Sequence, residues 1–347
     1  IKISDSISHL VLELTEDHGY FNELEIINKS YTGTGPDIIR KILKDNTTKK
    51  LLIGQAQNYN LPEFRYIVPN LSSYEAIKTV VDHITTPGGL PYFFYSSLVT
   101  NDLILTDLET VMRQGPFNEE IGSFTYSRAI QAQNTNMIDQ ALSISNLSSD
   151  HTNDTLSMAK RGALGSRINL TNSNTGSTRP FKLDMKQQFL QILNDNIDIF
   201  QGMDIPIDTL FRIDDRLSDD FGDFNSKVFS PLASNSYQDT NSLISNNETM
   251  IQLIVKNNLL KHLGNNSFII SVPGLLFGVN NRDRAVGREI KIKVLRDGDQ
   301  QSSNYLEDEN RSGNFLMMSK RHIFDLKSNA HNINIRVGRI ARPKRID

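Results

Sequence analysis

Aspartate is concentrated in one segment, residues 195 to 223, which holds nine Asp against two Arg. Carboxylate oxygens are the ligands that Ca²⁺ and Mg²⁺ prefer, and the candidates for such a site are Asp215, Asp219, Asp220 and Asp223. Their spacing does not follow the order of an EF-hand loop. A pair of these carboxylates could instead serve a glycan hydrolase, with Asp214 as a further candidate. The composition favours a solvated loop, or a patch that faces a basic partner, over either site.

A second candidate lies near the end of the sequence, where basic and aromatic residues adjoin. Lys320, Arg321 and His322 are consecutive, Phe324 follows, and Arg336 comes in the next alternating segment. Three neighbouring basic side chains suggest a phosphate site. The same residue types are common where an amphipathic strand ends. We therefore interpret these five residues as candidates for packing or for contact between subunits.

The usual signatures of enzymes do not occur in the sequence. It has no Cys, which excludes disulfides and thiolate nucleophiles, and its seven His do not form a zinc-binding helix motif. Gly33-Thr34-Gly35 is not a dinucleotide fingerprint, and the sequence has no phosphate-binding loop or nucleophile elbow. We predict no catalytic residue, no cofactor and no structural metal ion.

Composition limits the remaining classes. A chain of 347 residues is long enough for two to four domains. The longest apolar runs are far shorter than the roughly 20 residues of a membrane span, so no membrane insertion is predicted. The net charge of −3 argues against a dedicated nucleic-acid binder, because phosphate contacts need clustered Lys and Arg. Residues 282 to 347 nevertheless carry fifteen Lys and Arg against nine acidic residues.

Residues 35 to 112 have the signals of a small α/β unit. A helix is predicted from Gly35-Pro36, and Ser72 to Glu75 is a capping box ahead of a second helix that stops at Pro87. Two strands follow, at 91–95 and 103–105, and a further capping box from Thr106 opens a short helix.

The other segments are mainly extended. Residues 1–31 are predicted as β, with a turn at 17–19, and a helix from about 245 is expected to end in a left-handed cap at Gly264. Strands at 268–272, 290–294, 313–318 and 333–337 follow, and several alternate between apolar and polar residues. The sequence thus predicts an α+β, multidomain protein.

Three segments, in their order along the chain, resemble one family. They are Val68–Ile77 with Gly89–Tyr95, then Asn265–Gly274, then Ser312–Met318 with Arg321–Phe324. Together they are similar to the baseplate hub proteins of contractile-tailed, T-even-like bacteriophages, and to the hub module of type VI secretion spike proteins. Each segment is short, and the order and spacing carry the resemblance.

The resemblance implies a domain plan of two tube-type antiparallel β-barrel-like domains with inserted α/β domains. Residues 1–34 would be the end of the first tube domain, whose first strands we expect to be missing from this chain. Residues 35–118 would be an inserted α/β domain. Residues 119–185 together with 265–342 would form the second tube domain, and 186–264 an insertion that holds the acidic loop and a helix.

The resemblance also implies a structural role in the virion, in the tail baseplate, which is assembled in the host cytoplasm. The expected partners are two further copies in a homotrimer, the spike protein, the tail-tube and tube-initiator proteins, the tape-measure protein and the baseplate wedge proteins. DNA would pass through the ring without specific binding. Two alternatives stay open: a tail-associated cell-wall or glycan hydrolase that uses the segment 195–223, and a receptor-binding or fibre-connector module.

Overall fold

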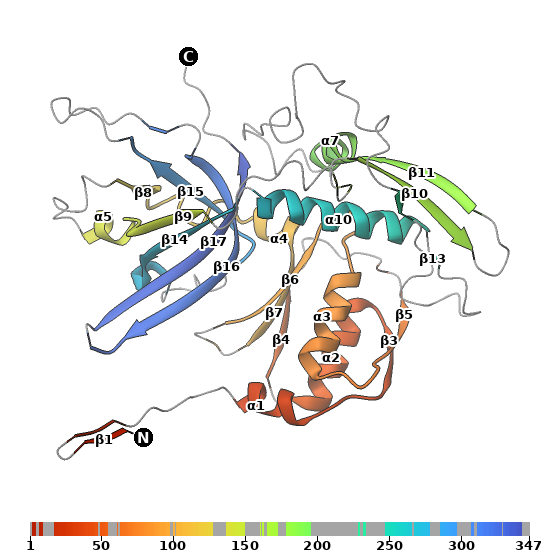
Figure 1. Ribbon diagram of the computed structural model, residues 1–347, viewed down its shortest axis with the longest axis horizontal. Helices are drawn as coiled ribbons and strands as arrows, with labels where there is room; N and C mark the ends of the chain where they lie inside the picture. The colour runs from red at the N-terminus through yellow and green to blue at the C-terminus, as the bar shows by residue number, and fades with distance from the viewer. Residues whose placement is uncertain are drawn as a thin grey trace.

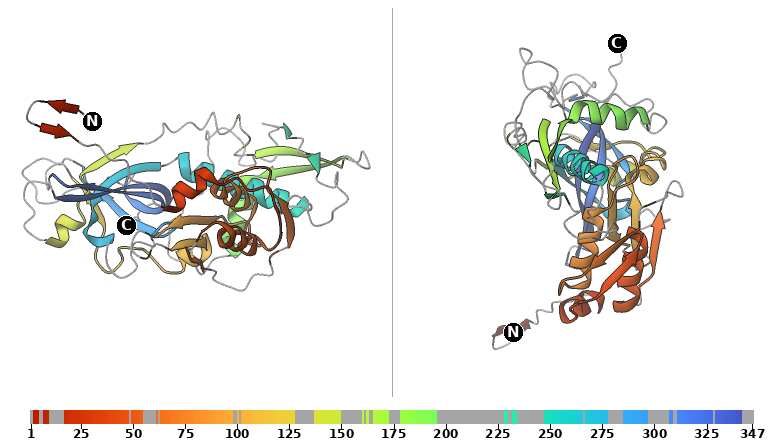
Figure 2. Two further views of the ribbon diagram at one scale, coloured as in Figure 1. Left: turned by 90° about the horizontal axis from the view of Figure 1, so that it is seen from below. Right: turned by 90° about the vertical axis from the view of Figure 1, so that its right-hand side faces the viewer.

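The computed structural model has an α+β fold with several domains, as the sequence predicts (Figure 1). Its described residues are 2–4, 7–9, 17–47, 49–54, 61, 63–97, 100, 102–127, 137–149, 160, 162, 165–172, 178–195, 228–229, 232–233, 247–265, 267–277, 285–296, 307–308, 311–327 and 329–341. A β-barrel and a twisted β-ribbon lie at opposite ends of the long axis, with helix α10 between them (Figures 1 and 2).

The N-terminal half forms an α/β unit around two helices. Helices α2 (Gly35–Asn46) and α3 (Ser73–His83) lie between the antiparallel pair β3 (Ser30–Gly33) and β5 (Phe64–Ile67) and a three-stranded sheet (Figure 1). That sheet has the order β4 (Leu51–Gly54), β7 (Leu103–Asp107), β6 (Tyr92–Ser96), with β4 parallel to β7. The shared core consists mainly of Ile, Val and aromatic side chains from these elements.

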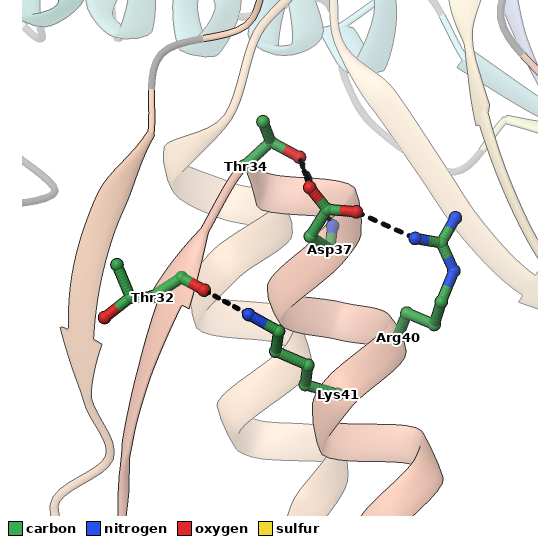
Figure 3. Close-up of polar contacts among 5 residues, drawn as sticks. All are labelled: Thr32, Thr34, Asp37, Arg40 and Lys41. Carbon is green, nitrogen blue, oxygen red and sulfur yellow. Dashed lines mark hydrogen bonds and ion pairs between the residues drawn. The ribbon is translucent and has the colours of Figure 1, made fainter.

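Local side-chain bonds fix where both helices begin. Thr34 caps α2, because its hydroxyl accepts from the backbone N–H of Asp37, and Pro36 occupies the first turn. The Asp37 carboxylate also accepts from the Thr34 hydroxyl and from Arg40, while Lys41 donates to the Thr32 carbonyl (Figure 3). The Thr34 hydroxyl, followed by Arg40, holds the pKa of Asp37 below its usual value.

The predicted capping box of α3 is confirmed. The Ser72 hydroxyl accepts from the backbone N–H of Glu75, and the Glu75 carboxylate accepts from the backbone N–H of Ser72. The short helix predicted after β7 is also present as α4 (Leu108–Met112), but its cap is Asp107, one residue beyond the predicted Thr106. Asp107 Oδ1 accepts from the N–H of Thr110, a bond that the Thr106 side chain does not make.

The barrel is built from six strands in the order β8, β15, β16, β17, β14, β9. Their bounds are β8 Phe124–Tyr126, β9 Asn146–Ser149, β14 Ser267–Pro273, β15 Glu289–Val294, β16 Gly313–Asp325 and β17 Ala330–Ala341. The segment just before β9 closes the barrel by pairing with β8. The N–H of Thr125 donates to the Leu142 carbonyl, and the N–H of Ile144 donates to the Thr125 carbonyl. Closure satisfies strand edges that would otherwise stay exposed.

Side chains fill the barrel. Phe117, Phe124 and Phe277 stack at one end, with ring centroids 4.6 Å apart for the Phe117–Phe277 pair. Alternate residues of the long strands complete this core, among them Phe315 and Met317. Helix α5 (Met137–Ala141) and the 3₁₀ turn η4 (Gly274–Phe277) pack at the periphery.

A second core lies between the barrel and a smaller sheet. Strands β10 (Gly165–Asn172) and β11 (Thr178–Asp184) pair with each other and with the short strands β12 (Val228–Phe229) and β13 (Leu232–Ala233). Helices α7 (Met185–Asp195) and α10 (Asn247–Asn265) bury apolar side chains with this sheet, with α4 and with Leu316 on the outside of the barrel. The domain boundaries expected from the resemblance stay a prediction.

Two predicted elements differ from the structure. Residues 17–19 begin a helix, α1 (Asp17–Leu24), where a turn between strands was predicted. Asp17 favours the positive helix start, and Gly19 is tolerated in the first turn. The prediction of a left-handed cap at Gly264 is wrong, because Gly264 continues α10 and does not have a positive φ. The short strands β1 (Lys2–Ser4) and β2 (Ile7–His9) form an antiparallel pair near the N-terminus.

Candidate interaction surface

The predicted interface residues lie on the two arms of the hairpin β16–β17. Lys320, Arg321, His322 and Phe324 belong to β16, and Arg336 belongs to β17. The basic-aromatic step that was expected to follow a strand is part of the strand itself. The five residues therefore share one β-hairpin.

The pairing register divides them between two faces. Lys320 is opposite Ile335 and His322 is opposite Ile333, and both Ile are fully buried in the barrel core. Opposite residues of an antiparallel pair point to the same side, so Lys320 and His322 continue the inner face of the barrel. Arg321 points to the other face. The three consecutive basic residues thus do not converge on one phosphate group.

A β-bulge sets this division. The register shifts between Met317 and Ser319, so Met318 is an extra residue in β16. After the bulge, Ser319 is opposite Arg336 on the outer face, which also carries Arg321. Arg321 and Arg336 therefore make the outer face of the hairpin basic.

A ring cluster occupies the inner face near the tip of the hairpin. His322 Nδ1 lies 3.0 Å from His331 Nε2, and the Phe324 ring stacks on His331 with centroids 4.2 Å apart. Gly274, the first residue of η4, has no side chain, and a Cβ there would collide with the His331 ring. The contact between His331 and Gly274 was not predicted from the sequence. A predicted hairpin register that pairs Phe324 with His331 would have placed His331 in this cluster.

The tip of the hairpin extends past the rest of the barrel (Figure 1). Strand β15 pairs only with the first four residues of β16, Gly313 to Leu316, and β14 pairs with β17 no further than Asn332. Apolar side chains are exposed on this projection, with 39% of Ile323, 58% of Phe324 and 92% of Leu326 accessible. Exposed apolar groups next to basic ones are typical of a protein–protein contact.

A buried ammonium joins α10 to the α/β unit. Lys256 is 3% exposed, and its Nζ donates to the carbonyls of Val81, Asp82 and Ile84 at 3.0, 2.6 and 3.1 Å. These carbonyls belong to the end of α3, where no intrahelical donor is available. Desolvation by burial lowers the pKa of Lys256 to about 8, and the nearby Asp82 opposes that change. Gln252, one turn earlier, donates to the carbonyl of Pro87.

A buried carboxyl lies on β15. Glu289 is 1% exposed, and burial raises its pKa to about 7. Within the part of the chain that the structure describes, its Oε1 makes no hydrogen bond. Lys291 lowers the pKa and Glu119 raises it, both less than burial does. Its cross-strand neighbour is Leu316, so the carboxyl lies on the outer face of the barrel, toward the second core.

The other candidates from the sequence are not brought together. Asp215, Asp219, Asp220 and Asp223 lie outside the described residues. Among the residues that are described, no group of three or more His, Asp or Glu is arranged to hold a metal ion. In that same part of the chain, no helix is both long and apolar enough to span a membrane.

Comparisons with known sequences and with solved structures have different outcomes. No protein-family model matches the chain, and no curated protein sequence does. Among solved structures, the tail protein from Neisseria meningitidis MC58 is similar over 92% of this chain and 72% of its own, with 11% identity and a TM-score of 0.42.

Proposed function

We propose that this chain is a structural subunit of a phage tail, the baseplate hub, and that three copies form a ring through the hairpin β16–β17. The observation that supports this most directly is the projecting hairpin with its apolar tip. Closure of the barrel leaves few strand edges elsewhere in it, while Ile323, Phe324 and Leu326 remain accessible on the hairpin. A rigid element with exposed apolar groups suits a contact between subunits.

The ring accounts for the charges on the hairpin. Arg321 and Arg336 share its outer face and would meet acidic groups of the adjoining subunit or of another baseplate protein. In the hub, the ring would join the tail tube to the trimeric spike, contact wedge and tape-measure proteins, and let DNA pass. These partners, and a place in the virion baseplate, follow from the sequence resemblance.

The test is the mass of the protein in solution. We expect the wild-type chain to form a trimer, either alone or with a trimeric spike protein, and Phe324→Asp to leave it monomeric. Ile67→Asp is the matched control, because Ile67 is 62% exposed on β5, in the α/β unit. Light scattering after size-exclusion chromatography distinguishes the states. A wild type that stays monomeric under both conditions contradicts the proposal.

The two alternatives have different outcomes. Hydrolysis of cell-wall glycan that is lost on Asp214→Asn or Asp220→Asn would establish the enzyme. Binding of the isolated chain to host cells or to their glycans would establish the receptor-binding module. A hub subunit does neither.

A further inference from the structure

We propose that His322 and His331 form a latch, released by acid, that joins the two arms of the hairpin β16–β17 near its tip and keeps His331 against Gly274 of η4. The two rings come from different arms of the hairpin, with Nδ1 of His322 and Nε2 of His331 3.0 Å apart. Their planes are 21° from parallel, and their centroids are 5.2 Å apart. The contact lies just beyond the last residue of β17 that pairs with β14, Asn332.

The contact depends on the charge of the pair. An N–H···N bond between imidazoles needs one ring nitrogen as acceptor, and a protonated imidazole has donors only. If one ring of the pair is protonated, the other ring is still neutral and keeps its acceptor nitrogen. If both rings are protonated, no acceptor remains and two positive charges lie side by side. Imidazole is the side chain that changes charge between about pH 5 and 8. The doubly protonated pair therefore cannot keep the bond.

Charged side chains lie on both faces of the hairpin around the pair. On β16, Lys320 shares the face of the pair, while Arg321 and Asp325 point to the opposite face. Lys327, the other charged residue near the tip, follows in the turn. On β17 the inner face continues with apolar Ile333, and the described residues of β14 and η4, 267–277, contain no titratable side chain.

The His331 ring of the latch is packed on both sides. His331 lies against the backbone of Gly274 on one side and against Phe324 on the other. If repulsion displaces the His331 ring from His322, that ring also leaves its place between Phe324 and Gly274. Release would therefore disorder the apolar tip, and this consequence for assembly rests on the proposed function. Acid would then weaken the ring that neutral pH favours.

The direct test is hydrogen exchange on the isolated chain, expressed as protection relative to the intrinsic exchange rate at each pH. Between about pH 7.5 and about pH 5, we expect protection of peptides from 319–333 to fall about tenfold, from repulsion between adjacent charges. Peptides from α2 serve as the internal reference. His331→Phe keeps an aromatic ring beside Phe324 and cannot be protonated, so the fall is expected to disappear. His83→Gln, on α3, is expected to leave it unchanged.

The outcomes separate the latch from the function. An equal fall in His331→Phe, or constant protection in the wild type, overturns the latch. The mass measurement is then made at both pH values. Trimers at neutral pH that dissociate in acid for the wild type, but not for His331→Phe, support both proposals. An acid-induced loss of protection in a chain that never assembles supports the latch and contradicts the ring.

Discussion

Replacement of Lys256 by Met tests the joint between α10 and α3. The side chains have similar lengths, so the change removes the ammonium and its three bonds while filling much of the same space. The carbonyls of Val81, Asp82 and Ile84 would lose their donor in an environment where Lys256 is 3% exposed. We expect the free energy of unfolding to fall by about 3 kcal/mol.

The magnitude is the difference between two opposing effects. Bonds from a charged donor contribute about 1.5–3 kcal/mol each, so three contribute about 5–9 kcal/mol. Burial lowers the pKa of Lys256 from 10.5 to about 8, and at about 1.4 kcal/mol per unit this disfavours the buried ammonium by about 3 kcal/mol. Met avoids that cost. The difference is about 2–6 kcal/mol, and relaxation around the vacated carbonyls favours the lower part of this range.

The pH dependence separates this explanation from a simple loss of packing. The pKa of Lys256 is lower in the folded chain than in the unfolded chain, so between about pH 8 and pH 10.5 the unfolded chain binds the additional proton. The free energy of unfolding of the wild type then rises with pH in that interval. Below pH 8 this pH dependence is absent, because Lys256 is protonated in both states. Lys256→Met has no such group. We therefore expect the difference in free energy of unfolding between the wild type and Lys256→Met to increase above pH 8.

Urea unfolding followed by circular dichroism at 222 nm is a suitable assay, since the chain has no Trp for fluorescence. Lys261→Met is the matched control, because Lys261 lies on the same helix and is exposed; its effect is expected within about 0.5 kcal/mol of zero. The reasoning fails if Lys256→Met unfolds at the wild-type midpoint, or if the difference narrows as the pH rises above 8.

Two further substitutions test the barrel. Glu289→Gln is expected to leave the free energy of unfolding nearly unchanged at about pH 4.5 and to raise it by up to about 3 kcal/mol at pH 8. The reason is that the buried carboxyl, with its pKa of about 7, makes the wild type lose stability as the pH rises from about 4.5 to 7. Urea unfolding at the two pH values measures this effect, and equal effects at both would contradict it. Gly274→Ala is expected to displace the His331 ring, to cost about 1–3 kcal/mol and to raise hydrogen exchange at the hairpin tip. Gly264→Ala, which meets no atom within 4 Å, is expected to be neutral or to stabilise α10 by up to about 1 kcal/mol; a similar loss in both variants would refute the steric explanation.

Local signals in the sequence predicted the elements that local bonds determine. The caps of α2 and α3 involve residues three positions apart, Thr34 with Asp37 and Ser72 with Glu75. The capping box of α3 was predicted from the sequence, and the start of α2 was predicted from Gly35-Pro36 without its Thr34 cap. Alternation predicted the barrel strands β15 and β17, since a period of two reflects one buried face, whereas β8 and β9 were not predicted. Helix α1 shows the limit, because Asp-His-Gly at 17–19 is compatible with a turn as well as with a helix start.

The buried polar groups could not be predicted in this way. Lys256 meets carbonyls 172 to 175 positions away in the chain, and within its own helix it has the form of an ordinary exposed lysine. Glu289 shares the alternation of β15 with Lys291 and Lys293, so its position in the sequence does not distinguish it from accessible residues. It is buried because the second core, from α7, α10 and β11, covers the outer face of the barrel there. Only the packing of distant segments decides such positions.

The bulge at Met318 explains why the hairpin presents the side chains it does. Phe315 and Met317 face the core, and a regular strand would continue this face through residues 319, 321 and 323. The extra residue moves Lys320, His322 and Phe324 to the inner face instead. Without it, Arg321 would extend the barrel stripe, and His322 would lie on the opposite side of the hairpin from His331. The ring cluster and the split of the basic residues thus have one cause, a single inserted residue that periodicity in the sequence does not reveal.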